Sequence, residues 1–259
     1  MKRLNQFCIP IILSAVLLGS AASAATGVDY DEYARLLEKY VAPSGVHYAD
    51  WAANDGDVSA LDGVLDHFAE VDLASLSTAQ QKAFYINLYN AAMLQAVFKE
   101  YPIQSVTKIG LIPFSIFKKN FIQQGDRELS LDDIEKGILL TEYFDARIHF
   151  AVNCASVSCP PLRPEPFVAE KLSSQLDEQT RLFAKTDHAA QVDNTMKRIA
   201  YSSLFKWYSK DFAVETPADY LNRFRDDLLP LDYKPSWIDY NWGLNQANES
   251  IEPKLTDTH

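Results

Sequence analysis

The sequence lacks the short motifs that mark several common enzyme classes. It contains no G-x-S-x-G, P-loop, G-x-G-x-x-G or H-E-x-x-H pattern, so the usual signatures of serine hydrolases, nucleotide-binding proteins, dinucleotide-binding proteins and metalloproteases are absent. Basic side chains are also few, with 24 lysines and arginines against 35 aspartates and glutamates and a formal net charge of −11. A chain this acidic is a poor partner for nucleic acid or for an anionic membrane surface.

Long apolar runs are missing after residue 24, where no stretch approaches the roughly 20 residues that a membrane helix needs. Residues 1–24 follow the order of a secretory signal peptide, because Lys2 and Arg3 precede an apolar run at 7–18 and the segment closes on Ala24. No cysteine stands at the junction, which argues against a lipid anchor. We therefore expect cleavage after Ala24 and a periplasmic protein with no membrane insertion after cleavage.

Internal repeats and Gly/Ser-rich or Pro-rich linkers are also absent. This predicts one domain over residues 25–245, followed by a polar tail at 246–259. Apolar spacing predicts the fold class α+β, a mostly helical single domain with a small central β-sheet. The predicted helices are 30–41, 56–70, 78–101, 130–140, 166–184 and 217–228, with a hairpin within 106–129 and a central strand at 148–152. Residues 199–207 are predicted as either a strand-to-helix segment or a helical one.

The helix at 78–101 is apolar over more than half of its circumference, so it must be largely buried. Ser77 can cap its first turn. Asn87 and Asn90 lie on this helix, and buried amides must find hydrogen-bond partners. We expect at least one of them to hold a distant loop and both to contribute to a binding site.

One segment, RIHFAVNCASVSCPP at 147–161, places His149, Cys154 and Cys159 within eleven residues. Imidazole and thiol are the side chains most easily tuned to react near neutral pH. On an unbroken strand, His149 and Asn153 face one side and Cys154 the other. Cys159, returned by the loop, is therefore the expected nucleophile, with His149 as its base and Glu135 as a candidate acidic partner.

Three interpretations of the cysteines remain open. In an oxidising compartment, two nearby cysteines most often form a disulfide, which would fix the loop shape, and this interpretation is narrowly favoured for the resting state. A reactive thiol is the second, since Asn153, Cys154 and Ser158 could line a binding site beside Cys159. Zinc is the weakest, because the spacing lacks the paired ligands of a standard site, and no metal or cofactor is predicted.

Five motifs follow one another along the chain: AFYINLYNA (83–91), YPI (101–103), LSLDDIE (129–135), RIHFAVNCASVSCPPL (147–162) and FKWYSKDF (205–212). Together they resemble the domain-of-unknown-function 547 (DUF547) family, over about residues 82–224 and more loosely from Tyr30. The resemblance implies little about mechanism, because the family is named for its lack of a known function. Lys136 and Leu140 stand where the resemblance leads us to expect a histidine and an arginine, so this chain departs from the pattern.

Two classes of function follow. The first is an exported thiol-dependent amide hydrolase or acyl transferase, in which Cys159 attacks, His149 moves the proton and backbone amides near Cys159 hold the oxyanion. The second is a non-catalytic protein that binds a small molecule or peptide in a pocket shaped by a Cys154–Cys159 disulfide and by Asn87 and Asn90. An envelope scaffold without a pocket is a third, weaker class.

Overall fold

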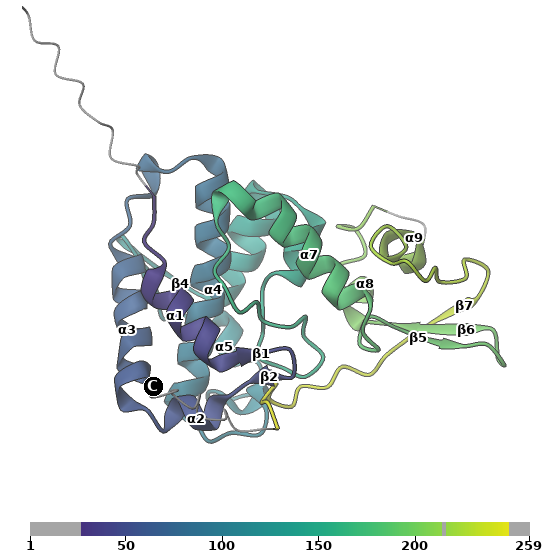
Figure 1. Cartoon of the computed structure of the whole chain (residues 1–259), viewed down its shortest axis with the longest axis horizontal. Coiled ribbons are helices and arrows are strands. Elements are labelled where there is room, and N and C mark those ends of the chain that lie inside the picture. The colour runs from purple at the N-terminus through teal and green to yellow at the C-terminus, as the bar shows by residue number, and fades with distance from the viewer. Residues whose placement is uncertain (1–26, 214–215, 249–259) are drawn as a thin grey trace, which may run out of the picture.

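The computed structural model describes residues 27–213 and 216–248. Its elements form two apolar clusters, a larger one built around α4 and a smaller one around Phe150 and the sheet β5–β6–β7. In Figure 1, α1, α3 and α4 form the helical half of the molecule, and the long sheet extends from the other side. The signal peptide expected at residues 1–24 lies outside the described residues.

The first helices follow from their apolar spacing. α1 (Asp31–Tyr40) buries Tyr33, Leu36, Leu37 and Tyr40, which share one face at helical intervals. α2 (Tyr48–Ala52) and α3 (Asp55–Ala69) follow, and both contact α1. All three pack beside α4, so the N-terminal part of the chain forms one wall of the large cluster.

α4 (Thr78–Glu100) is the central helix, and its prediction is confirmed. Ser77 and Gln80 form a capping box at its start, with side-chain and backbone hydrogen bonds in both directions. Residues on all its faces are buried, including Asn87 and Asn90. A long buried helix of this kind fixes the positions of the loops that it contacts.

The strands form three small sheets, and the mostly helical α+β class is confirmed. β5–β6 is antiparallel and β6–β7 is parallel, while the other two sheets are two-stranded antiparallel hairpins. The strands are β1 (Val41–Ala42), β2 (Gly45–Val46), β3 (Ile122–Gln124), β4 (Arg127–Leu129), β5 (Ala190–Asp193), β6 (Arg198–Tyr201) and β7 (Lys234–Trp237).

The central strand predicted at 148–152 is wrong. These residues belong mainly to a 3-10 helix, η4 (Ala146–Phe150), whose start is capped by the Asp145 side chain at 3.0 Å from the Arg147 N–H. A five-residue apolar run cannot distinguish a buried strand from a buried helical turn. The prediction that His149 and Cys154 face opposite sides assumed a strand, so it has no basis in this structure.

The remaining helices are mostly short. The helix expected at 166–184 begins only at α7, after a 3-10 turn, and the one expected at 217–228 ends early. The segment expected at 130–140 is a π-helix, η3, followed by α6. Their bounds are η1 (Leu73–Ser75), η2 (Val106–Lys108), α5 (Ser115–Lys118), η3 (Asp133–Leu139), α6 (Leu140–Glu142), η5 (Ala169–Lys171), α7 (Leu172–Ala184), α8 (Ser203–Trp207) and α9 (Pro217–Leu221).

After β7 the chain returns to the helical half as an extended strap, residues 240–247, drawn in yellow in Figure 1. The strap forms single β-bridges that join Gly243 to Ser105, Leu244 to Ser156 and Gln246 to Val46. Asn245 and Ala247 are hydrogen-bonded to Val46 of β2, so the strap stays paired with the helical half as far as Ala247. Across residues 27–213 and 216–248, no helix is both long and apolar enough to span a membrane.

Candidate active site

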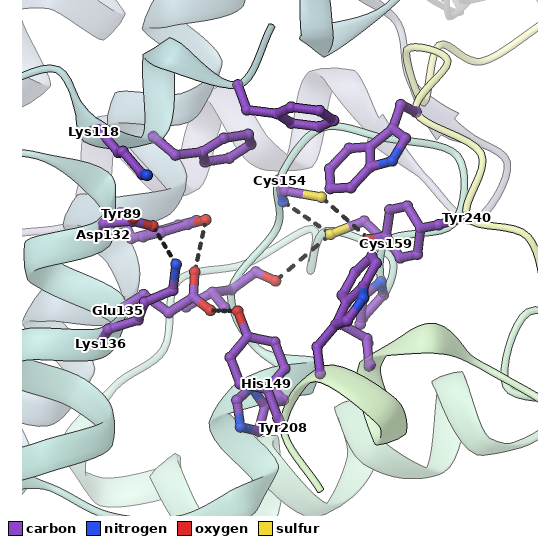
Figure 2. A pocket seen from close by; sticks show the side chains of 17 residues that line it. Tyr89, Lys118, Asp132, Glu135, Lys136, His149, Cys154, Cys159, Tyr208 and Tyr240 are labelled. Atoms are coloured by element: carbon purple, nitrogen blue, oxygen red, sulfur yellow. Dashed lines mark hydrogen bonds and ion pairs between the residues drawn. The ribbon is translucent and has the colours of Figure 1, made fainter. Parts of the chain in front are cut away.

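A cavity of about 430 Å³ opens beside the cysteine loop, which is the segment from Cys154 to Cys159. Its walls come from α4, α5, η3, η4, α8, the cysteine loop and the strap, which are segments far apart in the sequence. Figure 2 shows Glu135 between Tyr89 and Tyr208, and the two cysteines beside Tyr240. The cavity therefore brings together four of the predicted site residues, which are Glu135, His149, Cys154 and Cys159.

The cysteine loop is held by buried amides. The Asn90 side chain donates to the Ala151 carbonyl at 3.0 Å and accepts from the Asn153 N–H at 2.8 Å. Asn153 in turn donates to the Pro160 carbonyl at 2.7 Å and accepts from the Ala155 N–H at 2.9 Å. These bonds fix both ends of the loop, and they confirm that a buried amide of α4 holds a distant loop.

The two cysteines are free thiols in the structure, so the disulfide expected for the resting state is not formed. Cys154 is half-buried and Cys159 is buried. The Cys154 N–H donates to the Cys159 sulfur at 2.9 Å, while the Cys154 sulfur lies 3.0 Å from Ser156 Oγ and 3.4 Å from the Tyr240 hydroxyl. The loop shape therefore comes from hydrogen bonds instead of a covalent bridge.

These surroundings make the two thiols unequal. Burial raises the pKa of Cys154, but hydrogen bonds from Cys159, Ser156 and Tyr240 outweigh it and lower that pKa to about 7. Burial and the neighbouring Cys154 raise the pKa of Cys159 well above its ordinary value. Since the thiolate is the nucleophile, Cys154 is the more reactive of the two.

Glu135 is buried in the π-helix and faces the cavity, so it is not a surface charge. Its two oxygens accept hydrogen bonds from the Tyr208 hydroxyl at 2.7 Å and the Tyr89 hydroxyl at 3.2 Å. Burial and the Glu135 charge raise the pKa of both tyrosines. Both hydroxyls therefore stay protonated at neutral pH and donate to Glu135.

His149 is buried under Tyr208, with ring centroids 4.1 Å apart. Its Nε2 lies 2.8 Å from Asp211 Oδ2. Burial lowers the pKa of His149, although Asp211 and Glu135 oppose the shift. A neutral imidazole that faces a carboxylate donates from the facing nitrogen, which leaves Nδ1 as the basic nitrogen. Asp211 thus orients His149.

The family comparison matches residues 73–184 to a family described as "Protein of unknown function, DUF547". This region is therefore similar to DUF547. This region includes Glu135, His149 and both cysteines of the loop. No curated protein and no solved structure matched the chain.

The DUF547 region departs from the expected pattern at Lys136 and Leu140. Lys136 forms an exposed ion pair with Asp132 at 2.7 Å on the cavity rim. Leu140 begins α6 and is half-buried against the large cluster. In the described part of the chain, no three His, Cys, Asp or Glu side chains are grouped so that they could hold a metal ion.

Four of the predicted binding residues bond to backbone or side-chain groups near the cavity without lining it. Asn87 bonds the backbone of Phe167 at 2.8 and 2.9 Å, on a different segment from the cysteines. Ser158 Oγ accepts from the Asn241 N–H of the strap at 2.9 Å. Asn90 and Asn153 hold the backbone of the cysteine loop, and none of these four residues lines the cavity.

Most backbone amides near Cys159, where the oxyanion site is expected, already donate within the chain. Their acceptors are a sulfur, a side-chain oxygen or carbonyl oxygens, and the donors are the N–H groups of Cys154, Ala155, Val157, Ser158 and Cys159. The Ser156 N–H differs, because its hydrogen bond to the Cys154 sulfur lowers the pKa of that thiol. It therefore remains a backbone donor beside the sulfur.

Sequence reasoning missed the residues that lie far from the loop in the sequence. Tyr89 shares α4 with the two asparagines, and its buried hydroxyl was a signal that could have been used. Tyr208 is part of the FKWYSKDF motif. Tyr240 and Trp242 lie on the strap, where no periodic pattern indicates their position. An aromatic wall results, because Tyr240 contacts Trp207 and Trp242 at centroid distances of 4.9 and 4.5 Å.

Proposed function

We propose that this protein is a thiol-dependent amide hydrolase or acyl transferase in which Cys154, and not Cys159, is the nucleophile. One observation carries the proposal: Cys154 is half-buried and lines the cavity, and donors around its sulfur lower its pKa to about 7. Near neutral pH, such a thiol is about half ionised, whereas an ordinary cysteine is ionised by only a few per cent.

The proposed reaction begins when the Cys154 thiolate attacks the substrate carbonyl carbon. The sulfur loses its negative charge as the carbonyl oxygen gains it. The Tyr240 and Ser156 hydroxyls, which contact the sulfur in the resting state, are then free to donate to that oxygen. This shift of donors favours the transition state over the ground state, which is the requirement for catalysis.

We assign proton transfer to His149 and Glu135, two other polar side chains of the cavity. Expulsion of the amine requires a proton, and deacylation requires a base to activate water or an acceptor amine. Neutral His149, oriented by Asp211, and Glu135, held by two tyrosines, both line the cavity. Within the described residues no hydrogen bond joins His149 to a cysteine, so we assign these groups to the substrate and not to activation of the thiol.

The cavity fits a substrate with an apolar part beside its amide. Aromatic rings of Phe114, Trp207 and Trp242 form one wall, and Lys136 with Asp132 forms an ion pair on the rim. Rings of this kind bind apolar or planar groups, while the ion pair adds no net charge. We therefore propose a small molecule or peptide that is neutral near the scissile bond.

The experiment uses p-nitrophenyl acetate as a generic acyl donor, with Cys8→Ser in every protein so that the thiol of Cys8 does not interfere. We expect a burst of p-nitrophenolate and an acetyl thioester on Cys154, located by peptide mass spectrometry. Cys154→Ser should lose the burst, and Glu135→Gln should slow turnover more than the burst. Acetylation that persists unchanged in Cys154→Ser would refute the proposal and favour a non-catalytic binding protein.

A further inference from the structure

We propose that Cys154 and Cys159 also form a redox pair that exchanges disulfides with a thiol-containing partner, with Cys154 as the attacking thiol and Cys159 as the resolving thiol. This activity goes beyond acyl transfer, because Cys159 has no covalent role in that reaction. It would use the same cavity and the same attacking sulfur.

The first argument is the position of the second sulfur. A resolving cysteine must reach the attacking cysteine, yet remain shielded from outside reagents. Cys159 meets both requirements, because its sulfur accepts the Cys154 N–H at 2.9 Å while only 8 % of the residue is exposed. Cys154 lines the cavity and is half-buried, so a partner can approach that sulfur first.

The second argument is the stiffness of the loop between the thiols. Asn153 joins the two ends through the Pro160 carbonyl at 2.7 Å, and the strap contacts the middle through Ser156 and Ser158. Closing a disulfide across a preorganised loop costs little chain entropy, because the loop is already ordered. The loop therefore holds the Cys159 sulfur against the Cys154 N–H without a covalent bond.

The third argument is the set of hydrogen bonds that stabilise the reduced pair. Ser156 and Tyr240 contact the Cys154 sulfur, and the Cys159 sulfur accepts the Cys154 N–H. A disulfide sulfur carries no charge and accepts these bonds weakly. Stabilising the reduced form makes a pair easier to reduce, so its disulfide is readily passed on to other thiols.

The exchange balances as two substitutions at sulfur. The Cys154 thiolate attacks one sulfur of the partner disulfide, which forms a mixed disulfide and releases the first partner thiolate. Cys159 then loses its proton to that thiolate or to water and attacks the Cys154 sulfur. This forms the Cys154–Cys159 disulfide and releases the second partner thiolate. Two electrons pass from the protein to the partner disulfide, and the reverse sequence oxidises a partner dithiol.

Oxidised glutathione serves as the probe, and all proteins carry Cys8→Ser. The reference protein carries Cys8→Ser alone. In it we expect a short-lived mixed disulfide that converts to the internal disulfide. Both species are detected by intact-mass analysis after acid quenching and alkylation. In Cys159→Ser, the mixed disulfide on Cys154 should accumulate, because no second thiol can resolve it. In Cys154→Ser, the buried Cys159 should react at least about tenfold more slowly than Cys154 does in the reference protein.

Two results would overturn the redox pair: a reference protein in which the mixed disulfide is as persistent as in Cys159→Ser, or a Cys154 that does not react with oxidised glutathione. Cys159→Ala is a second variant, and urea unfolding of each protein verifies that it is folded. The two proposals fail separately. If only the redox pair is wrong, the reference protein still forms the acetyl thioester on Cys154; if only acyl transfer is wrong, the internal disulfide still forms.

Discussion

The two buried asparagines of α4 allow a matched test of how the cysteine loop is held. Asn87 and Asn90 lie on the same helix, are nearly fully buried, and each makes two hydrogen bonds to backbone groups of a distant segment. They differ in the segment they hold: Asn87 binds Phe167, whereas Asn90 binds the residues that lead into Cys154. Replacing each by leucine keeps the volume similar and removes both bonds.

The expected loss of stability can be derived from these contacts. Each leucine leaves one buried N–H and one buried carbonyl without a partner, at a cost of about 1–3 kcal/mol each. Burying leucine in place of an amide returns part of this cost. We expect the free energy of unfolding to fall by about 2–4 kcal/mol in both Asn87→Leu and Asn90→Leu, measured by urea denaturation.

The reactivity of Cys154 should separate the two variants. Asn90→Leu releases the Asn153 N–H, so the hydrogen bonds around the Cys154 sulfur weaken, its pKa rises and its alkylation by iodoacetamide at pH 7 slows severalfold. Asn87→Leu should leave that rate unchanged while costing the same stability. The reasoning is refuted if both variants unfold like the reference protein, or if both change the alkylation rate equally.

Three further predictions follow from other contacts. The rate of Cys154 alkylation should rise with pH around a midpoint near 7, and Tyr240→Phe should move the midpoint to higher pH, because it removes a donor that lowers the pKa. Burial alone would raise the Asp57 pKa, but bonds from Lys39, Tyr40 and Arg35 lower it well below its ordinary value. These bonds therefore stabilise the folded protein, and Asp57→Asn should lower the free energy of unfolding by about 1–3 kcal/mol at pH 7. That stabilisation is complete above the ordinary pKa of about 4 and is lost at lower pH, so the difference between the two proteins in urea unfolding should shrink on acidification. Exported protein should begin at Ala25 by intact-mass analysis, and a mass that retains residues 1–24 would contradict the signal peptide.

Part of this fold could be predicted because some signals are local. The apolar spacing and Ser77 cap identify α4, and the α1 and α3 helices follow from the same kind of periodicity. η4 could not be predicted, since the short and mostly apolar stretch at 148–152 fits either a strand or a helical turn and only tertiary packing decides. That single error also removed the reason for preferring Cys159 to Cys154 as the nucleophile, because this preference depended on strand geometry.

The candidate site was predictable only where its residues are close in the sequence. His149, Cys154 and Cys159 lie in one segment, and Glu135 was a candidate from the adjacent motif. The groups that set the Cys154 pKa are different, since Tyr240 reaches the sulfur across a separation of 86 residues. No local pattern predicts such a contact. Composition also could not show that the loop is fixed by amides instead of by a disulfide.

The strap at 240–247 has a consequence for the timing of biosynthesis. A ribosome makes Cys154 long before Tyr240, and until the strap docks against Ser156 the sulfur lacks one of its donors and part of its cover. During synthesis the thiol therefore has a pKa nearer its ordinary value and reacts slowly near neutral pH. The full lowering of its pKa needs the later part of the chain to fold back, so a chain interrupted before residue 240 lacks the Tyr240 donor.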